Sequence, residues 1–454
     1  MTQLDLPNIQ GFVVRGYRLP AASYLFLHVD ERVKASRWVS YAADEVINAA
    51  PWSRKPEAGI NVAFTYAGLE ALGVPPYSLA GFPLEFREGM AARADVLGDR
   101  EDSDPKRWEE PFGPDNDIHV MVMISAKDEE ALAARKAQAC ERIDDFGGLT
   151  VVGSQVGQAL LDEGTGKSRE HFGFVDGFGQ PSIEGSGVEP RPGQGAVDGK
   201  GKWRPIRAGE FILGYLDEEG VLPVAAPPDQ LTANGTFLIY RKLRQEVGQY
   251  RRQLRRAAEL FPGSEELLKA KIVGRWPDGT PLILSPDGPD PAIAEDKMRN
   301  NAFSYAEDAE GEGCPIGGHI RRANPRDSLP FEGKLVNRHR MIRRGISYGP
   351  ELPEGVEDDG EDRGLIFTCL QASIERQFEF VQSQWLNEGN VFGIGDDQDL
   401  LTGNQDNEPP RKMVVPGCPP FFIDDLSRLI TCTGGEYFFT PGINGLHFIS
   451  AADG

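Results

Sequence analysis

Alternating apolar and polar positions predict several short strands in the first half of the chain. They are residues 61–65 (NVAFT), 117–126 (DIHVMVMISA) and 149–156 (LTVVGSQV). Residues 66–74 and 127–144 follow the first two strands and have helical spacing, and acidic residues begin the second of these helices, where they complement the helix dipole. The first half is therefore predicted to contain two strand–helix units.

The second half repeats this order of elements. Residues 209–215 (GEFILGY), 235–243 (GTFLIYRKL) and 364–372 (GLIFTCLQA) are predicted as strands. Residues 241–260 are predicted as a basic, solvated amphipathic helix, because Leu243, Val247, Tyr250 and Leu254 recur on one face. Residues 373–387 form a further helix with Ser373 as its N-cap. The repetition indicates two related α+β sandwiches.

A chain of 454 residues exceeds what one hydrophobic core usually serves, so two domains are expected. The Gly- and Pro-rich stretch at about 186–207 is the predicted junction. The predicted domains are 1–200 and 201–454, and the second has an irregular insertion at about 262–362. Long irregular segments in compact domains are usually functional or disordered, and the motifs of this one favour function.

The composition is that of a water-soluble protein, with 40% hydrophobic and 26% charged residues and no apolar run long enough to span a bilayer. The first residues lack a basic leader and an apolar core, which predicts a cytoplasmic location. A net charge of −22 argues against nucleic-acid binding. The five cysteines have no CxxC spacing and are predicted to be reduced thiols; Cys314 could ligate iron as a thiolate, but a lone Cys is more often a buried apolar residue.

Two short segments carry the candidate chemistry. In residues 171–185 (HFGFVDGFGQPSIEG), Asp176 stands alone among phenylalanines, where a carboxylate is expensive to bury. In GGHIRRANPR, His319 follows two glycines and precedes Arg321, Arg322 and Arg326. A histidine that ligates a planar iron cofactor, beside arginines that neutralise its propionates, fits this pattern. A surface histidine in a basic loop fits it too, and the spacing alone does not decide between them.

Three motifs resemble those of the dye-decolorizing peroxidases. GFVDG at 173–177 resembles the GxxDG signature of that family, GGHIRRANPR resembles the stretch around its proximal haem histidine, and RRGISYG at 343–349 resembles its distal arginine segment. NIQGFVVRGY, NVAFTYAGLEALGV and IERQFEFVQSQW also look like family blocks. The blocks occur in the expected order over almost the whole chain, and its length is similar to that of the longer subgroups.

The resemblance implies an α+β fold, a duplicated ferredoxin-like sandwich of two antiparallel sheets with covering helices. It places haem b in the C-terminal half and the distal GFVDG loop in the N-terminal domain. His319 is then the proximal iron ligand, and Asp176 and Arg343 are the catalytic residues across the ring. Arg344 is adjacent and could be confused with Arg343, which is preferred because it stands two places before the glycine of RRGISYG.

The resemblance also implies further contacts to the haem. They come from Arg321, Arg326, Gly177, Leu365 and Phe367. Asp399, in FGIGDDQDLLTG, is the expected acceptor for the second ring nitrogen of the proximal histidine. Asp396, Asp397, Glu375 and Glu379 stay as alternatives for that acceptor.

The function implied by the resemblance is a haem-dependent peroxidase that uses hydrogen peroxide to oxidise bulky aromatic donors such as dyes and phenols. The alternative is a haem-handling protein that stores or delivers haem or removes its iron, with incidental peroxidase activity. A third reading is a haem-free interaction protein that has kept the fold. No nucleic acid or membrane partner is expected, and the sequence leaves open the physiological donor and assembly as a homo-oligomer.

Overall fold

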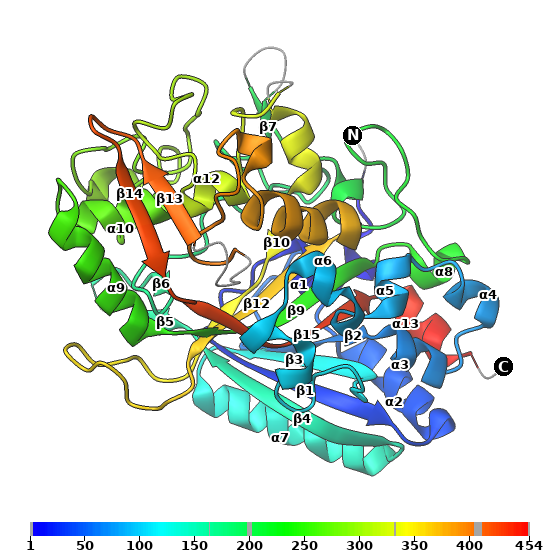
Figure 1. The fold of residues 1–454 in the computed structure, drawn as a ribbon. Helices are drawn as coiled ribbons and strands as arrows, with labels where there is room; N and C mark the ends of the chain where they lie inside the picture. Colours follow the sequence, from blue (N-terminus) through cyan, green and yellow to red (C-terminus); the bar gives the residue numbers. More distant parts are fainter. Residues whose placement is uncertain (1–2, 163, 198–201, 331–332, 404–410, 453–454) are drawn as a thin grey trace.

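One antiparallel sheet of nine strands runs through the computed structural model, which describes residues 3–162, 164–197, 202–330, 333–403 and 411–452 (Figure 1). The strand order is β10–β12–β9–β15–β2–β3–β1–β4, and β11 also pairs with β12. The strands are β1 Ala21–Val29, β2 Ala58–Phe64, β3 Val120–Ala126, β4 Leu149–Gln158, β9 Thr236–Gln245, β10 Ile342–Arg343, β11 Ile346–Tyr348, β12 Gly364–Gln371 and β15 Ile430–Thr440. Three two-stranded sheets lie outside it: β5 Leu160–Leu161 with β6 Ser168–Arg169, β7 Ala196–Val197 with β8 Trp203–Arg204, and β13 Arg411–Val415 with β14 Phe421–Leu426.

Each half of the large sheet has the same strand order. In the N-terminal half the order is β4–β1–β3–β2, so the first strand lies between the fourth and the third. In the C-terminal half the order is β15–β9–β12, with β10 and β11 on the outer edge of β12, which is the same arrangement. The predicted α+β fold and the duplicated ferredoxin-like order are confirmed. The four strands of the N-terminal half and the five of the C-terminal half join edge to edge where Phe439 of β15 pairs with Phe64 of β2.

The two halves also pack face to face. The rings of Tyr24 and Phe26 on β1 lie 5.4 and 5.3 Å from the ring of Tyr240 on β9, both edge to face. At the far edge, Gly157 of β4 lies so close to β11 that a Cβ atom there would be 2.5 Å from Cγ2 of Ile346. The halves therefore enclose a shared interior, and β1 is buried along almost its whole length.

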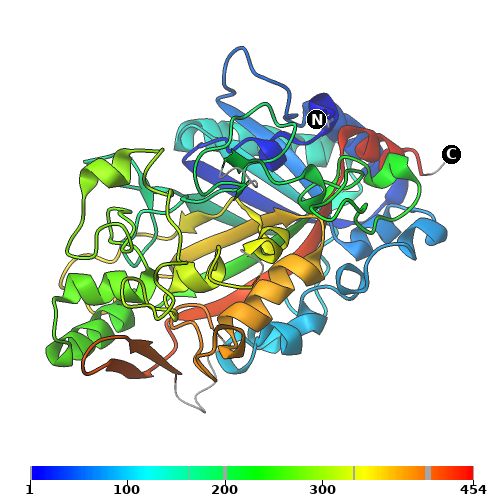
Figure 2. The ribbon, with the colours of Figure 1, turned by 90° about the horizontal axis from the view of Figure 1, so that it is seen from above.

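Two helices cover the outer face of the N-terminal half, α2 Arg32–Glu45 and α7 Glu129–Phe146 (Figure 1). The side chain of Asp128 caps α7 by accepting from the Ala131 amide, as the acidic start of this helix predicts. In the C-terminal half the main helices are α9 Val247–Leu260, α10 Glu265–Val273 and the continuous helix formed by η8 Ile374–Glu379 and η9 Val381–Leu386, which has π-type hydrogen bonds. Ser373 caps this last helix, as predicted. Figure 2 shows the helix in orange over the strands of the C-terminal half.

Short helices fill the connections between these elements. They are η1 Leu6–Asn8, α1 Gly11–Val14, α3 Tyr66–Ala71, α4 Pro76–Leu79, α5 Leu84–Glu88, η2 Ala91–Arg93, α6 Ala94–Leu97, η3 Glu101–Ser103, η4 Pro105–Arg107, η5 Ala208–Glu210, α8 Asp229–Thr232, α11 Pro291–Glu295, α12 His319–Ala323, η7 Leu335–His339, η10 Asn390–Phe392 and α13 Ile443–Ser450. Within the described residues no helix has the length and apolar character needed to cross a membrane.

Two element predictions are wrong. Residues 209–215 do not form a strand. The short helix η5 leads into a turn in which the side chains of Phe211, Ile212 and Leu213 are fully buried, so this apolar run belongs to a buried turn and not to a strand. The basic helix begins at Val247, because residues 241–245 continue β9 and Leu243 pairs with Leu365 of β12. Of the predicted junction at 186–207, residues 198–201 lie outside the described part of the chain, and the domain limits 1–200 and 201–454 stay a prediction.

Candidate active site

A cavity of about 430 Å³ lies between the C-terminal half of the sheet and the insertion. One wall is made by alternate residues of three neighbouring strands, because successive side chains of a strand point to opposite faces. These residues are Arg241, Leu243 and Gln245 on β9, Leu365 and Phe367 on β12, and Ile430 and Cys432 on β15. The predicted contact residues Leu365 and Phe367 thus line the cavity.

His319 lines the cavity from the start of α12. Its Nδ1 lies 3.0 Å from Oδ2 of Asp399, whose side chain is buried. The other carboxylate oxygen of Asp399 accepts from the Leu401 amide (3.0 Å), the Thr402 amide (2.7 Å) and the Thr402 hydroxyl (2.9 Å). The hydrogen bonds within turn 399–402 therefore hold the Asp399 carboxylate in place independently of its contact with the His319 imidazole.

The charges at this pair set the protonation of the ring. Burial alone would raise the pKa of Asp399, but the charge and hydrogen bond of His319 outweigh it and lower the pKa to about 2. Burial would likewise lower the pKa of His319, and the charge and hydrogen bond of Asp399 raise it instead. An ionised carboxylate only accepts, so Nδ1 carries the proton. Among the described residues Nε2 has no hydrogen-bond partner, and it is left for a ligand in the cavity.

The other candidate acceptors for His319 have different partners. The carboxylate of Asp397 lies 3.6 Å from Nζ of Lys412, and Asp396 pairs with the same lysine at 2.9 Å. Glu379 is buried in an ion pair with Arg93 and accepts from the hydroxyl of Tyr437. Glu375 is exposed on η8. The structure therefore brings Asp399 to His319 and leaves the alternatives elsewhere.

Asp176, Gly177 and Arg343 line the same cavity. Gly177 has φ +89°, a conformation that favours glycine, and its amide donates to Oδ1 of Asp176 at 2.5 Å. Nη2 of Arg343 donates to the carbonyl of Phe178 at 2.7 Å, which ties β10 to the loop that carries Asp176. Among the described residues no ion pair joins Asp176 and Arg343 directly. Their charges both reach His319, since Arg343 lowers its pKa and Asp176 raises it.

Arg343 and Arg344 point to different parts of the protein. The Arg344 guanidinium donates to the carbonyls of Phe12 and Arg343, and it does not line the cavity. Consecutive residues of a strand face opposite sides, and Arg343 ends β10. The predicted choice of Arg343 over Arg344 thus agrees with the side of the strand that faces the cavity.

Four arginines give the surroundings of this cavity an excess of positive charge. Arg275 is buried and Arg326 and Arg343 are half-buried in the cavity wall, and Arg340 is buried beside it, where it donates to the carbonyl of Gly179. Their hydrogen bonds go to carbonyl and amide oxygens, and none of the four forms an ion pair within the described part of the chain. Burial and mutual repulsion lower the pKa of Arg275 and of Arg340 to about 9. Buried cations normally have an anionic partner, so a ligand with acidic groups is expected here.

These features fit an iron porphyrin. An imidazole with an unpartnered Nε2 can ligate iron, and the arginine cluster can neutralise two propionates. The Asp176 carboxylate and the Arg343 guanidinium, which line the same cavity, can move a proton and stabilise negative charge.

Arg321 does not line the cavity, although it was predicted to contact the cofactor. Its guanidinium forms an ion pair with Asp308 at 2.9 Å, donates to the Cys314 carbonyl and stacks on Tyr305 at 4.5 Å. In a helix, residues two apart face different directions, so Arg321 points away from the face that holds His319. Cys314 is buried and its pKa is raised to about 11, which agrees with a neutral thiol.

Comparisons with known proteins give the same family as the motifs. A family model described as the DyP dimeric alpha+beta barrel domain matches residues 8–147. A dye-decolorizing peroxidase of Mycena epipterygia is 30% identical over 490 residues, which cover 99% of this chain and 88% of the relative. The chain belongs to the dye-decolorizing peroxidase family. It is therefore an oxidoreductase of the peroxidase type.

Solved structures of dye-decolorizing peroxidases have the same fold over the full length. One, in complex with 2,6-dimethoxyphenol, is 28% identical with a TM-score of 0.83 and covers 99% of this chain and 100% of that chain. Another, from work on asymmetric sulfoxidation by engineering the haem pocket of a dye-decolorizing peroxidase, is 26% identical with a TM-score of 0.85 and the same coverage. Solved relatives of this chain thus include one that binds a phenol and one with a haem pocket.

Several cavity residues of this dye-decolorizing peroxidase were not predicted. Glu170, Gln245, Arg241 and Arg275 all line the cavity. Arg241 was predicted at the end of strand 235–243 and also at the start of the basic helix, and Gln245 was assigned to that helix alone. The strand in fact continues to Gln245, so both side chains follow the alternation that turns them toward the cavity. Glu170 stands three residues before the first residue of the GFVDG motif, and a second acid so close to the loop is the signal that could have identified it.

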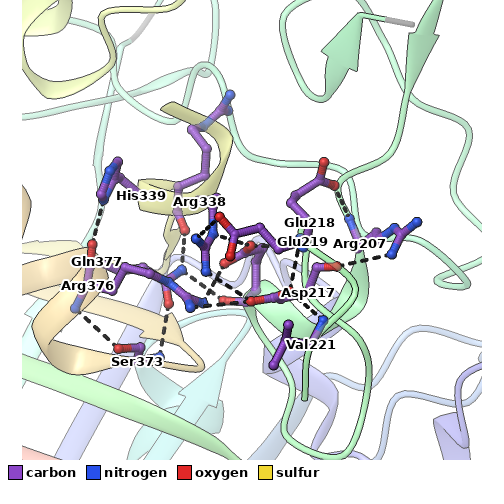
Figure 3. Close-up of polar contacts among 12 residues, drawn as sticks. Arg207, Asp217, Glu218, Glu219, Val221, Arg338, His339, Ser373, Arg376 and Gln377 are labelled. Atoms are coloured by element: carbon purple, nitrogen blue, oxygen red, sulfur yellow. Dashed lines mark hydrogen bonds and ion pairs between the residues drawn. The ribbon is translucent and has the colours of Figure 1, made fainter. Parts of the chain in front are cut away.

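Figure 3 shows an ion-pair cluster in which Arg338 and Arg376 meet the acidic residues Asp217 and Glu219. Arg338 pairs with Asp217 (3.1 Å) and Glu219, and Arg376 of η8 pairs with Glu210 (2.8 Å) and Asp217 (3.4 Å). Burial raises the pKa of Glu210 to about 7 against the opposing charge of Arg376. The cluster therefore joins the loop before β9, the η7 segment and the helix after β12.

We expect Arg338→Met to lower the free energy of unfolding by about 1–3 kcal/mol, because the buried carboxylate of Asp217 loses one charged donor and keeps its pair with Arg376. The measurement is the urea unfolding midpoint of the haem-loaded protein. Arg142→Met is the matched control, since the pair of Arg142 with Asp145 is exposed at 45% and 53% and should contribute less than about 1 kcal/mol. Equal losses in the two variants would contradict a stabilising role of the cluster.

Proposed function

We propose that this peroxidase binds haem b between His319 and the Asp176–Arg343 wall and uses hydrogen peroxide to oxidise bulky aromatic donors. The observation that carries the proposal is the Nε2 of His319, which has no hydrogen-bond partner among the described residues, on a histidine that lines the same cavity as Asp176 and Arg343. When bound, the haem iron would receive the peroxide and supply the oxidising equivalents that the donors consume.

On the proximal side, His319 is proposed to ligate the iron through Nε2. Asp399 accepts the Nδ1 proton, which fixes the tautomer and the orientation of the ring and makes the imidazole a stronger base. Arg326 and Arg275, whose hydrogen bonds go to uncharged oxygens, are proposed to neutralise the propionates.

On the distal side, Asp176 is proposed to act as acid and base. Its carboxylate takes a proton from one oxygen of hydrogen peroxide and returns it to the other oxygen, which leaves as water. Arg343 presents a permanent positive charge to the oxygen on which negative charge develops as the O–O bond breaks. Gly177 lets the backbone pass close to the ligand, because its positive φ is accessible without a side chain.

The donor class is proposed from the related peroxidase that binds 2,6-dimethoxyphenol. The test is steady oxidation of this phenol and of a bulky anthraquinone dye by the haem-loaded protein with hydrogen peroxide. Many turnovers per haem, with the haem absorption retained, are expected. One turnover or fewer, with release of iron from the porphyrin, would favour the alternative of a haem-handling protein.

We expect Asp399→Asn to lower haem affinity or turnover by about 10- to 100-fold, because an amide in place of the carboxylate makes the His319 imidazole less basic. A haem titration, the turnover at saturating haem and the midpoint potential of the iron, which should rise, are the measurements. Asp397→Asn is the control, since that carboxylate neighbours Lys412 and not His319. An unchanged potential in Asp399→Asn would remove Asp399 from this role.

A further inference from the structure

Glu170 is a half-buried acid of the cavity wall that the proposed mechanism does not use. Its Oε1 accepts from the Phe174 amide at 2.9 Å, and its Oε2 accepts from the Phe172 amide at 2.9 Å and from Nε2 of Gln245 at 2.6 Å. Three N–H groups thus converge on one carboxylate. Such charge-assisted hydrogen bonds are stronger than bonds between neutral groups.

The hydrogen bonds of Glu170 close a tight turn just before Asp176. The Glu170 amide donates to the Phe174 carbonyl at 3.0 Å, and the Gly173 amide donates to the Glu170 carbonyl at 2.9 Å. Gly173 has φ +100°, which the reversal of the chain requires. Two residues beyond the turn, the Asp176 amide donates to the Ser168 carbonyl at 3.0 Å. The two limbs of the loop are therefore held together with Glu170 between them.

Gln245 connects this turn to the rigid part of the molecule. Gln245 is the last residue of β9. Its backbone N–H donates a hydrogen bond to the Arg363 carbonyl at 2.9 Å, which extends the pairing of β9 with β12. An ionised carboxylate offers acceptors to all three N–H groups, whereas a glutamine would turn an NH₂ group toward one of them. The residue type at position 170 thus suits the donors that surround it.

We propose that Glu170 is a positioning residue for Asp176, and that its carboxylate fixes turn 170–174 on β9 and so sets where the Asp176 carboxyl stands in the cavity. The inference rests on the proposed role of Asp176. A misplacement of about 1 Å at a reacting group can cost about 100-fold in rate, so the anchor has a measurable consequence.

The test uses the haem-loaded full chain and two second-order rate constants, one for hydrogen peroxide and one for the phenol donor. Glu170→Gln should lower the peroxide constant by about 10- to 100-fold and leave the donor constant and the haem absorption unchanged. Asp162→Asn is the matched control, because its carboxylate also accepts backbone amides in a nearby turn but does not line the cavity. A parallel fall of both constants in Glu170→Gln would overturn the inference.

The double variant Glu170→Gln/Asp176→Asn decides whether Glu170 acts through Asp176. It should be no slower than Asp176→Asn alone, since a residue that positions another has no effect once that other is removed. Losses that multiply would overturn the inference. If Asp176→Asn is slow and Glu170→Gln is normal, the inference fails alone; if Asp176→Asn is normal, the proposed role of Asp176 fails first.

A second variant covers the case in which Glu170→Gln does not fold. Gln245→Met removes one of the three donors and keeps the carboxylate with its two backbone bonds. The peroxide constant should then fall by about 2- to 10-fold, the value of one hydrogen bond, with the donor constant unchanged. No change in either constant would count against the anchor.

Discussion

Asp176→Asn is expected to lower the second-order rate constant for hydrogen peroxide by about 10²- to 10⁴-fold, which is what a positioned proton-transfer group contributes. Asparagine has nearly the same shape as aspartate, so the loop and the Gly177 contact should persist, but the amide cannot accept a proton. Haem binding should be unaffected, because His319 and Asp399 form a separate unit. The rate of phenol oxidation at saturating donor, with peroxide varied, measures the effect.

The control for this variant is Asp278→Asn. Asp278 accepts from the amide and hydroxyl of Thr280 in a loop close to the Asp176 segment, and it does not line the cavity. Its replacement should leave the peroxide constant within about twofold of the parent protein, since no reacting group moves. A normal peroxide constant in Asp176→Asn would show that another group transfers the proton.

The sequence predicted the strands β2, β3, β4, β9 and β12 of the large sheet and missed others, among them β1 and β15. β1 (AASYLFLHV) was not predicted, because it is buried on one face by helices and on the other by β9, and a continuous apolar run carries no period of two. β15 was missed because Gly434 and Gly435 resemble a turn, whereas the structure has an irregular register there between Cys432 and Gly434. Both errors come from the closed packing of the two halves.

The candidate site divides in a similar way. The motifs identified His319, Asp176 and Arg343 and chose Asp399 among several acids, and the structure brings these four to one cavity and its immediate surroundings. The sequence motifs could not show which further residues line the cavity, because that depends on the direction in which each side chain points. Arg321 points away from the cavity because of helical geometry. The position of Glu170 next to the GFVDG motif is visible in the sequence, but the donors that its carboxylate meets are set by the fold.

His319→Ala is expected to abolish specific haem binding and to reduce turnover at least about 100-fold, toward the background of free haem. The substitution removes the open Nε2 of the cavity wall and leaves the arginine cluster to hold the propionates without an iron ligand. Titration with haem followed by absorption, together with dye oxidation at each haem level, measures both effects. His447→Ala is the control, because this histidine is exposed on α13.

The Asp399 carboxylate makes this prediction more specific. In the parent protein the charge and hydrogen bond of His319 help to hold the pKa of Asp399 at about 2, and in His319→Ala the carboxylate keeps the Leu401 and Thr402 donors without a cation at Oδ2. Added imidazole can occupy the space of the lost ring, donate one N–H to Asp399 and present its other nitrogen to the iron, so it should restore part of the haem absorption. Haem absorption and turnover that survive His319→Ala without imidazole would mean that a different residue binds the iron.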